Sequence, residues 1–368
     1  MTKSATLAGN PASRAAMRQP RPPREVSPFE FWPGWIFYAP VILQWIALGL
    51  RHGDMSLPTA ANPAIETGGL CGESKGAILD LLTGPARDWV APYTRIDSRA
   101  DTATVSGALE RAGLSFPLIL KPDIGCNGTG VRLVHDLDGL VRGLPDYPAG
   151  TQMVLQRFIA WEGEAGLFYI RHPHEAHGRI TSVTLKEAPY VVGDGRATLR
   201  ELVLRDRRAG LVPHLYLPRL AGRLEEVPAQ GVPVRLVLVG NHCKGSIFHD
   251  GAEHLTQALT ERIDMMARAM PEFYFGRFDV RFASLPALHR GEDFAVIEVN
   301  GVGSEATHVW DARTTLRKAW TDELRHFSAA WKIGQANRAR GHKPSGLRPM
   351  YQAWMLQRRL MAAYPVSD

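Results

Sequence analysis

The sequence is poor in cysteine, which excludes a disulfide-stabilised fold and a zinc site built from cysteines. Only three cysteines occur among 368 residues, and Cys71, Cys126 and Cys243 are widely spaced. A scattered, odd-numbered set matches neither a disulfide framework nor a zinc-ligand spacing, which fits a reducing, cytoplasmic environment. A chain of this length also exceeds what one simple core supports, so two or three packed units are expected.

The body of the chain lacks the positive charge that nucleic-acid binding would need. The net charge is +6, but residues 1–28 contribute +4 and residues 333–368 contribute +5, which leaves −3 for residues 29–332. Affinity for phosphate must therefore come from particular side chains, and we expect small-molecule partners and no nucleic acid. Residues 1–28 have no apolar core and are rich in Pro, Ala and Arg, so a disordered tail is expected there, not a signal peptide.

No apolar run reaches the length of a regular membrane span. The longest, residues 35–50, is interrupted by Pro40 and Gln44 and is shorter than the ~20 residues that crossing a bilayer requires. Three interpretations remain open: a buried helix, an interfacial helix with aromatic anchors, and a truncated span. The interfacial alternative would add peripheral contact with the inner face of the membrane, and the basic helix expected near residues 350–361 would be a second contact.

Two segments place polar side chains inside otherwise apolar strands. Residues 276–281 read GRFDVR, and residues 294–300 read FAVIEVN. The linker at 283–293 contains Pro and Gly and is long enough to bring the two strands back antiparallel. Because strand side chains alternate between faces, Arg277 and Asp279 share one face of the first segment.

Glu298 and Asn300 share one face of the second segment in the same way. A surface hairpin with solvated charges is the alternative, but Glu298 lies where a buried strand should be apolar. Carboxylate and amide oxygens are the ligands that Mg²⁺ prefers in proteins. The pattern therefore predicts a metal site of Asp279, Glu298 and Asn300 for Mg²⁺, with Mn²⁺ as the alternative ion.

A glycine-rich loop at residues 125–130 lies between two expected strands. Gly125, Gly128 and Gly130 would let backbone N–H groups approach a polyphosphate closely, although a plain glycine hairpin is the alternative. No Gly-Lys-Ser/Thr follows, and the loop leads into a strand, so it is neither a Walker loop nor a dinucleotide fingerprint. Lys121 and Lys186 each end an apolar strand and are placed to meet phosphate charge.

Taken together, these segments resemble the ATP-grasp superfamily, close to D-alanine–D-alanine ligase and the ligase modules of cyanophycin and glutathione synthesis. Six matching elements occur in the family's order over roughly residues 110–315. They are PLILKP at 117–122, the loop at 125–130, LQRFI at 155–159, VGDG at 192–195 with TL at 198–199, RFD at 277–279 and EVN at 298–300.

The resemblance implies a fold that agrees with the α+β class expected from the pattern of strands and helices. It implies an ATP-grasp fold, in which two α/β lobes with mixed and antiparallel sheets enclose ATP. The lobes would cover about 106–158 and 159–332. A short divergent N-terminal region at 29–105 would precede them, and a basic C-terminal tail with an amphipathic helix would follow at 333–368.

The resemblance also implies roles for individual residues. Arg277 and Lys186 would be catalytic, and Asp279, Glu298 and Asn300 would hold the metal. ATP would be bound by Lys121, Gly125, Gly128, Gly130, Gln156, Arg157, Phe158, Ile159 and Glu164. Three departures from the family pattern stand out: Gln156 where a carboxylate is frequent, Glu164 one residue late with Glu162 as its rival, and GVGSEATH after Asn300 where the ligases have a proline–glycine turn.

The activity implied is that of an ATP-dependent carboxylate–amine ligase. ATP would convert a carboxylate to an acyl phosphate, and an amine would attack it to give an amide, ADP and phosphate. The alternatives are a phosphotransferase with the same fold and a catalytically inactive nucleotide-binding protein at the membrane surface. The expected partners are a small-molecule carboxylate and amine, and the sequence predicts no oligomeric state.

Overall fold

The computed structural model describes residues 26–238 and 240–368. Most of the predicted disordered tail, residues 1–28, therefore lies outside the described residues. Its last three residues are described, and the Ser27 amide donates a hydrogen bond to the Glu30 carboxylate at 3.3 Å.

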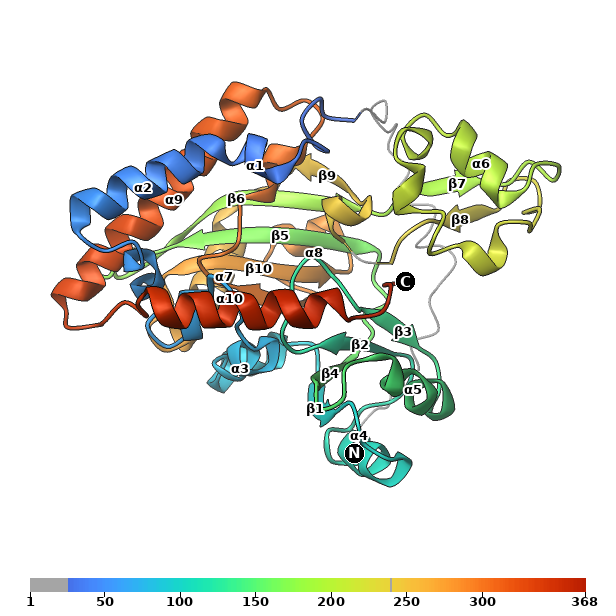
Figure 1. The fold of residues 1–368 in the computed structure, drawn as a ribbon, viewed down its shortest axis with the longest axis horizontal. Coiled ribbons are helices and arrows are strands. Elements are labelled where there is room, and N and C mark those ends of the chain that lie inside the picture. Colours follow the sequence, from blue (N-terminus) through green and yellow to red (C-terminus); the bar gives the residue numbers. More distant parts are fainter. Residues whose placement is uncertain (1–25, 239) are drawn as a thin grey trace.

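Two antiparallel sheets form the body of the molecule (Figure 1). The first has the order β1-β4-β2-β3, with β1 at Tyr93–Asp97, β4 at Gln152–Arg157, β2 at Leu118–Pro122 and β3 at Arg132–Val134. The second has the order β11-β10-β5-β6-β9, with β11 at Phe294–Asn300, β10 at Phe275–Phe282, β5 at Gly163–Ile170, β6 at Arg179–Glu187 and β9 at Ile247–Asp250. This α+β arrangement with antiparallel sheets confirms the predicted fold class.

Helices cover both sheets. Helices α4 (Thr102–Arg111) and α5 (Leu137–Gly143) share a core with the first sheet. Helices α7 (Gln257–Ala269) and α8 (Leu285–His289) pack on one face of the second sheet, and α9 (Leu316–Ala339) covers part of the other face together with α2 (Ala39–His52). The remaining helices α1 (Gly34–Phe37), α3 (Lys75–Asp80) and α10 (Leu347–Ala362) lie at the edges of this body.

A third, smaller unit is inserted between β6 and β9. It holds the two-stranded sheet of β7 (Tyr190–Val192) and β8 (Pro233–Arg235), helix α6 (Leu199–Arg205) and a separate hydrophobic core. Figure 1 shows this unit at the right-hand end of the molecule. Strand β8 ends at Arg235, and residues 236–238 are not in a strand.

Other differences concern boundaries. Strand β1 belongs to the sheet of the first lobe, although the N-terminal region was predicted to extend to residue 105. The predicted linker at 283–293 contains α8, and the boundary placed at 332/333 falls inside α9. Segment 35–50 forms α1 and α2, which bury only one face. Among the described residues, no helix combines the length and the apolar character that a membrane crossing requires.

The second sheet separates an apolar face from a charged one. Phe278, Val280 and Phe282 of β10 point into the core shared with α7. Their alternates Arg277, Asp279 and Arg281 point to the opposite face, because neighbouring residues of a strand face opposite ways. Helix α9 covers the Phe168 and Phe275 end of that face, which leaves the charged end open toward the first lobe.

Candidate nucleotide and metal site

The predicted pairing of the two polar strands is present. In the register of β10 with β11, Arg277 lies opposite Asn300 and Asp279 lies opposite Glu298. Residues directly opposite each other in an antiparallel pair project from the same face of the sheet. The structure therefore brings together on one face the four residues that the sequence placed there. Their roles remain predictions.

Asp279 is the centre of this cluster. Its carboxylate accepts hydrogen bonds from Lys186 Nζ at 2.9 Å, from Arg277 Nε and Nη2 at 2.9 and 3.0 Å, and from Asn300 Nδ2 at 3.0 Å. Burial alone would raise the pKa of Asp279, but the adjacent Arg277 and Lys186 hold it well below its usual range. Asp279 is therefore a permanently ionised, buried oxygen donor.

Glu298 pairs with a cation that the sequence did not identify as a site residue. Lys75, the first residue of α3, places Nζ 3.1 Å from Glu298 Oε1 and also donates to the carbonyl oxygen of Gly125. Burial opposes ionisation of Glu298, yet Lys75 and Lys121 lower its pKa. Lys75 therefore joins the N-terminal region, the glycine loop and the metal strand at one point. Its only sequence signal was the glycine-rich turn before α3.

Lys121 lies at the floor of the same site. It is buried, and its ammonium donates to Gln156 Oε1 and to the carbonyl oxygen of Ile297, both at 2.9 Å. Burial lowers the pKa of Lys121 to about 8. Lys75 adds to this shift, and Glu298 partly offsets it. At position 156 the family often has a carboxylate, which would raise the pKa of Lys121. Gln156 is a neutral acceptor, so the pKa of Lys121 stays low.

This pKa predicts a pH-dependent affinity for nucleotide. Above pH 8, Lys121 loses its proton in the free protein and must regain it when it binds phosphate. The Kd for a Mg²⁺-bound, non-hydrolysable ATP analogue should therefore rise by up to about tenfold from pH 8 to pH 9. Lys121→Arg should flatten this dependence, because a guanidinium stays charged over that range. Titration calorimetry at several pH values measures both slopes. If Kd depended on pH equally in the parent protein and in Lys121→Arg, Lys121 would not be a phosphate contact.

The predicted hinge links the two sheets. Gln156 and Arg157 end β4 of the first sheet, and β5 of the second sheet begins at Gly163. The Arg157 amide bonds to the carbonyl of Pro92 at 2.8 Å, and the Phe158 amide bonds to that of Pro117 at 3.4 Å. Residues 156–159 therefore lie at the junction of the lobes, as the hinge interpretation requires. Whether Phe158 and Ile159 contact adenine stays a prediction.

Glu164 is held within the ion-pair cluster. It is buried, with Oε1 3.4 Å from Lys186 Nζ and Oε2 3.2 Å from Arg281 Nη2. Its rival Glu162 is exposed and lies 3.9 Å from Arg235 Nη1. Both contacts of Glu164 are with cations of the second sheet, so a ribose contact would require part of this network to rearrange.

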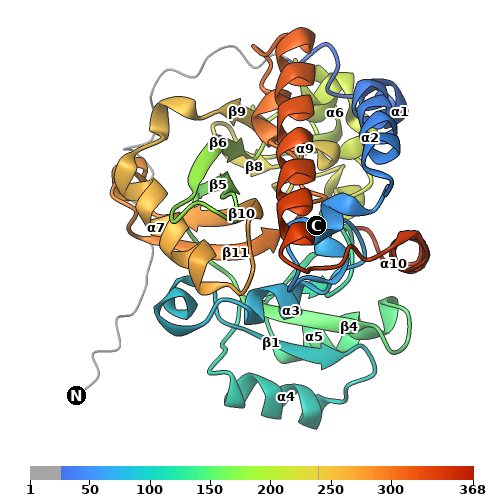
Figure 2. The ribbon, with the colours of Figure 1, turned by 90° about the vertical axis from the view of Figure 1, so that its left-hand side faces the viewer.

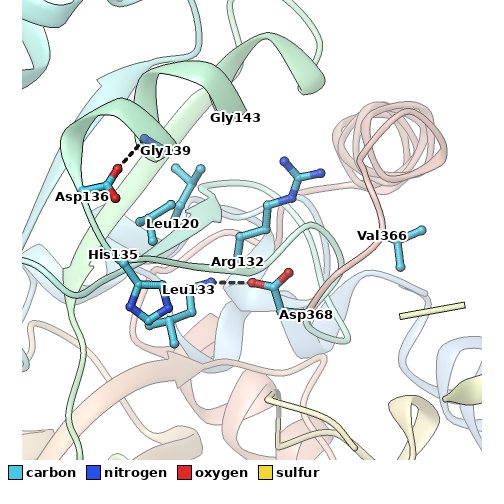
Figure 3. Close-up of a pocket in the computed structure, with 10 residues that line it drawn as sticks. Leu120, Arg132, Leu133, His135, Asp136, Gly139, Gly143, Val366 and Asp368 are labelled. Atoms are coloured by element: carbon cyan, nitrogen blue, oxygen red, sulfur yellow. Dashed lines mark hydrogen bonds between the residues drawn. The ribbon is translucent and has the colours of Figure 1, made fainter. Parts of the chain in front are cut away.

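The glycine loop is fastened by the C-terminal residues, which were predicted to be a tail. The Tyr364 hydroxyl donates to the Ile124 carbonyl at 2.8 Å. Ser367 Oγ accepts from the Gly130 amide at 3.0 Å and donates to the Gly128 carbonyl at 2.6 Å. Just beyond the loop, the Leu133 amide donates to Asp368 at 2.7 Å (Figure 3). We call residues 364–368 the C-terminal strap.

The strap gives the predicted mobility of the loop a specific test. Loop 125–130 is expected to be mobile without nucleotide and ordered with it, because glycine-rich turns lack side chains that would hold them. Ser367→Ala removes two hydrogen bonds of about 1 kcal/mol each, so exchange of the Gly130 amide should become about thirtyfold faster without nucleotide. Ser106→Ala, on the exposed side of α4, is the control.

Hydrogen-exchange mass spectrometry with and without a Mg²⁺-bound ATP analogue measures this effect. Nucleotide should protect the loop in both the parent protein and the Ser367→Ala variant. Equal protection with and without nucleotide would argue against a phosphate-covering role for the loop. Unchanged exchange in Ser367→Ala would show that the strap does not restrain it.

The aromatic N-terminal segment forms a wall beside Arg277. Glu305 accepts hydrogen bonds from the Tyr38 hydroxyl and, at 3.0 Å, from Trp310 Nε1. Its backbone carbonyl accepts from Arg277 Nη1 at 3.1 Å. Phe37 packs on Trp310 with ring centroids 4.5 Å apart. Part of segment 35–50 therefore buries its aromatic side chains against the residues that follow the metal strand.

The side-chain oxygens of Asp279, Glu298 and Asn300 are the kind of ligand that a hard metal ion prefers. No group of three or more His, Cys, Asp or Glu side chains suited to a metal ion occurs in residues 26–238 and 240–368. The predicted set is instead two carboxylates and one amide, and all three belong to the paired strands β10 and β11. Hard oxygens of this kind, completed by nucleotide phosphates, suit Mg²⁺. Asp279, Glu298 and Asn300 therefore fit the ion.

Comparison with known proteins gives matches to solved structures alone. No family model and no curated protein matches the sequence. A bifunctional glutathione synthetase from Pasteurella multocida matches at 15% identity and a TM-score of 0.36, over 69% of this chain and 35% of that one. The VanG D-Ala:D-Ser ligase from Enterococcus faecalis matches at 14% identity and a TM-score of 0.41, over 71% of this chain and 62% of that one.

A D-alanine–D-alanine ligase from Bacillus anthracis matches at 16% identity and a TM-score of 0.39, over 76% of this chain and 70% of that one. By their names these proteins are ligases and synthetases, the kind of enzyme that the sequence motifs resemble. The chain spans about a third of the glutathione synthetase and less than two thirds of the VanG ligase. Likenesses at these identities and scores carry no argument about substrates.

Proposed function

We propose that this protein is an ATP-dependent ligase that joins a carboxylate to an amine through an acyl phosphate. The observation that carries the proposal is the cluster between the two sheets, where Lys186, Arg277 and Asn300 surround the ionised Asp279, and Glu298 faces Lys75. Phosphoryl transfer needs positioning and charge neutralisation more than covalent chemistry by the protein. A cluster of buried cations and hard oxygens beside a glycine loop supplies both.

In the first step, a carboxylate oxygen of the substrate bonds to the γ-phosphorus of ATP, and the bond from that phosphorus to the β,γ-bridging oxygen breaks to release ADP. Lys121 and Lys186 would neutralise phosphate oxygens, and Arg277 would steady the transferred group. Mg²⁺, held by Asp279, Glu298 and Asn300, would supply charge neutralisation between phosphates.

In the second step, the amine nitrogen bonds to the acyl carbon, and the carbon–oxygen bond to phosphate breaks. The amide forms, phosphate leaves, and the nitrogen loses a proton. Glu305 lies next to Arg277 and is reached by Tyr38 and Trp310, so this polar and aromatic wall would border the attacking amine.

Hydroxylamine trapping tests the proposal. Purified protein with Mg²⁺-ATP and pooled carboxylates should form hydroxamates in the presence of hydroxylamine, because an acyl phosphate reacts with that nucleophile. With pooled amines instead, release of ADP and phosphate should require both substrates. A stable phosphorylated product without hydroxamate would identify a phosphotransferase. Nucleotide binding without any turnover would favour an inactive nucleotide-binding protein.

A further inference from the structure

Helix α10 exposes the side that a surface helix usually buries. Leu347, Tyr351, Trp354 and Met355 follow helical spacing along one stripe, and all four are exposed. Ala353 is the only residue of α10 that is buried. In a globular protein the apolar stripe of a surface helix normally faces the core. On α10 that stripe is turned toward solvent.

Helix α2 and the turn before it expose a second apolar stripe. Trp35 is 73% exposed, Leu43 is 67% exposed and Leu50 is 72% exposed. The other side of α2 is fixed to α9, where Gln44 Nε2 donates to Ser328 Oγ at 2.9 Å and Trp45 packs edge-on against Trp331. The helix is therefore anchored to the body, and its outward side chains stay exposed.

The two helices that carry these stripes lie on the same side of the molecule. Both α2 and α10 are in the foreground of Figure 1, and both are at the right-hand edge of Figure 2, which is turned by 90°. We call the exposed side chains of residues 35–50 and 347–356 the apolar face. Exposed apolar side chains that gather in this way mark a site of association with another molecule or a membrane.

The charge around this face is positive. Arg348, Arg358 and Arg359 are exposed on α10, and Arg51 is exposed at the end of α2. Residues 1–25, which lead directly into the segment before α1, carry a further net charge of +4, whereas residues 29–332 carry −3. Exposed arginines therefore lie on both helices that carry the apolar stripes.

We propose that the apolar face docks on an anionic phospholipid surface, with its Trp, Tyr and Leu side chains in the interface and its arginines on lipid phosphates. Aromatic and leucine side chains beside Arg are the composition of interfacial helices, and basic residues add attraction to anionic lipid. A second copy of the chain fits less well. Residues 34–52 and 347–362 contain no Asp or Glu, so a two-fold contact between these helices would bring arginines together without carboxylates to pair with them.

Vesicle flotation tests the proposal on the full chain. The protein should float with vesicles of phosphatidylcholine and phosphatidylglycerol (about 7:3) at low salt. We expect at least tenfold weaker association with pure phosphatidylcholine vesicles, and a similar loss in 0.5 M NaCl, because screening removes the phosphate attraction. Tyr351→Ser with Trp354→Ser, and separately Arg358→Glu with Arg359→Glu, should each reduce binding about tenfold.

Matched changes elsewhere serve as controls. Leu211→Ser with Val227→Ser alters exposed apolar residues of the inserted unit, and Arg111→Glu with Arg142→Glu alters exposed arginines of the first lobe. Neither pair should change vesicle binding. Circular dichroism and thermal melting of every variant confirm that the fold is retained, and no step requires a known substrate.

Three results would overturn the proposal. The first is no association of the parent protein with anionic vesicles. The second is binding that disappears when residues 1–25 are removed but is unaffected by the substitutions on α10. The third is a concentration-dependent dimer without vesicle binding that is lost in Tyr351→Ser with Trp354→Ser, which would assign the face to a second copy.

Discussion

Asp279→Asn is expected to lower turnover in the proposed ligase reaction by about a thousandfold or more. The substitution keeps the size of the side chain but removes the charge that would hold Mg²⁺ and orient Lys186 and Arg277. Phosphate charge would then go uncompensated during transfer. Release of ADP with an identified substrate pair, per mole of folded protein, is the measurement. Glu298→Gln should have a similar effect through the other carboxylate.

The same substitution should also destabilise the protein. Asp279 is bonded to two buried cations, Lys186 and Arg277. Removing one partner of a buried ion pair leaves an uncompensated charge and costs about 3–5 kcal/mol. Calorimetry gives the melting temperature of the Asp279→Asn variant, and turnover must be measured well below that temperature.

Asp264→Asn is the matched control. Asp264 is also buried, and it accepts hydrogen bonds from the Tyr169 hydroxyl and the Gly178 amide, both at 2.7 Å, on the α7 side of the second sheet. Its loss should reduce stability without changing turnover per folded molecule. Near-normal ATP consumption by folded Asp279→Asn would show that the metal assignment is wrong.

The pairing of β10 with β11 could be predicted because each strand combines two incompatible local signals. An apolar strand with polar residues at alternate positions has few explanations other than a buried site. The same reasoning could not find Lys75, since its contact with Glu298 joins residues more than 200 positions apart. The turn before α3 predicts a helix start, but nothing local shows which strand that start will face.

Helix α9 was missed for a related reason. Its buried positions include Glu323, His326 and Asn337, so the side that packs on the sheet does not form a continuous apolar stripe. Helix α8 was missed because Pro286 and Gly291 suggested a linker. The Ser284 hydroxyl nevertheless accepts a hydrogen bond from the Ala287 amide and caps the helix. Proline is tolerated in the first turn of a helix, so Pro286 does not prevent α8 from forming.

The apolar segment 35–50 satisfies parts of two of its three interpretations. Phe37 and Val41 are buried, as a core helix requires, whereas Leu43 and Leu50 are exposed, as an interfacial helix requires. Composition alone could not separate these alternatives, because the outcome depends on which side α9 covers. Helix α9 was itself not predicted from the sequence.

Gly301→Ala is expected to destabilise the protein by about 2–4 kcal/mol, because the backbone of the N-terminal turn lies against this residue. A Cβ at position 301 would meet the carbonyl oxygen of Gly68 at 2.4 Å and the Cα of Gly69 at 2.8 Å. The turn is paired there with the chain just after the metal strand, since the Val302 amide donates to Gly68 at 3.1 Å. The departure from a proline–glycine turn after Asn300 therefore has a structural reason.

Urea unfolding measures this effect, and Gly222→Ala is the control, because a Cβ at Gly222 meets no atom within 4 Å. The control should change the free energy of unfolding by well under 1 kcal/mol. Gly301→Ala should also weaken nucleotide binding, since a displaced turn carries Lys75 away from Glu298. If both variants unfold at the same urea concentration, the turn at 68–69 does not support the end of β11.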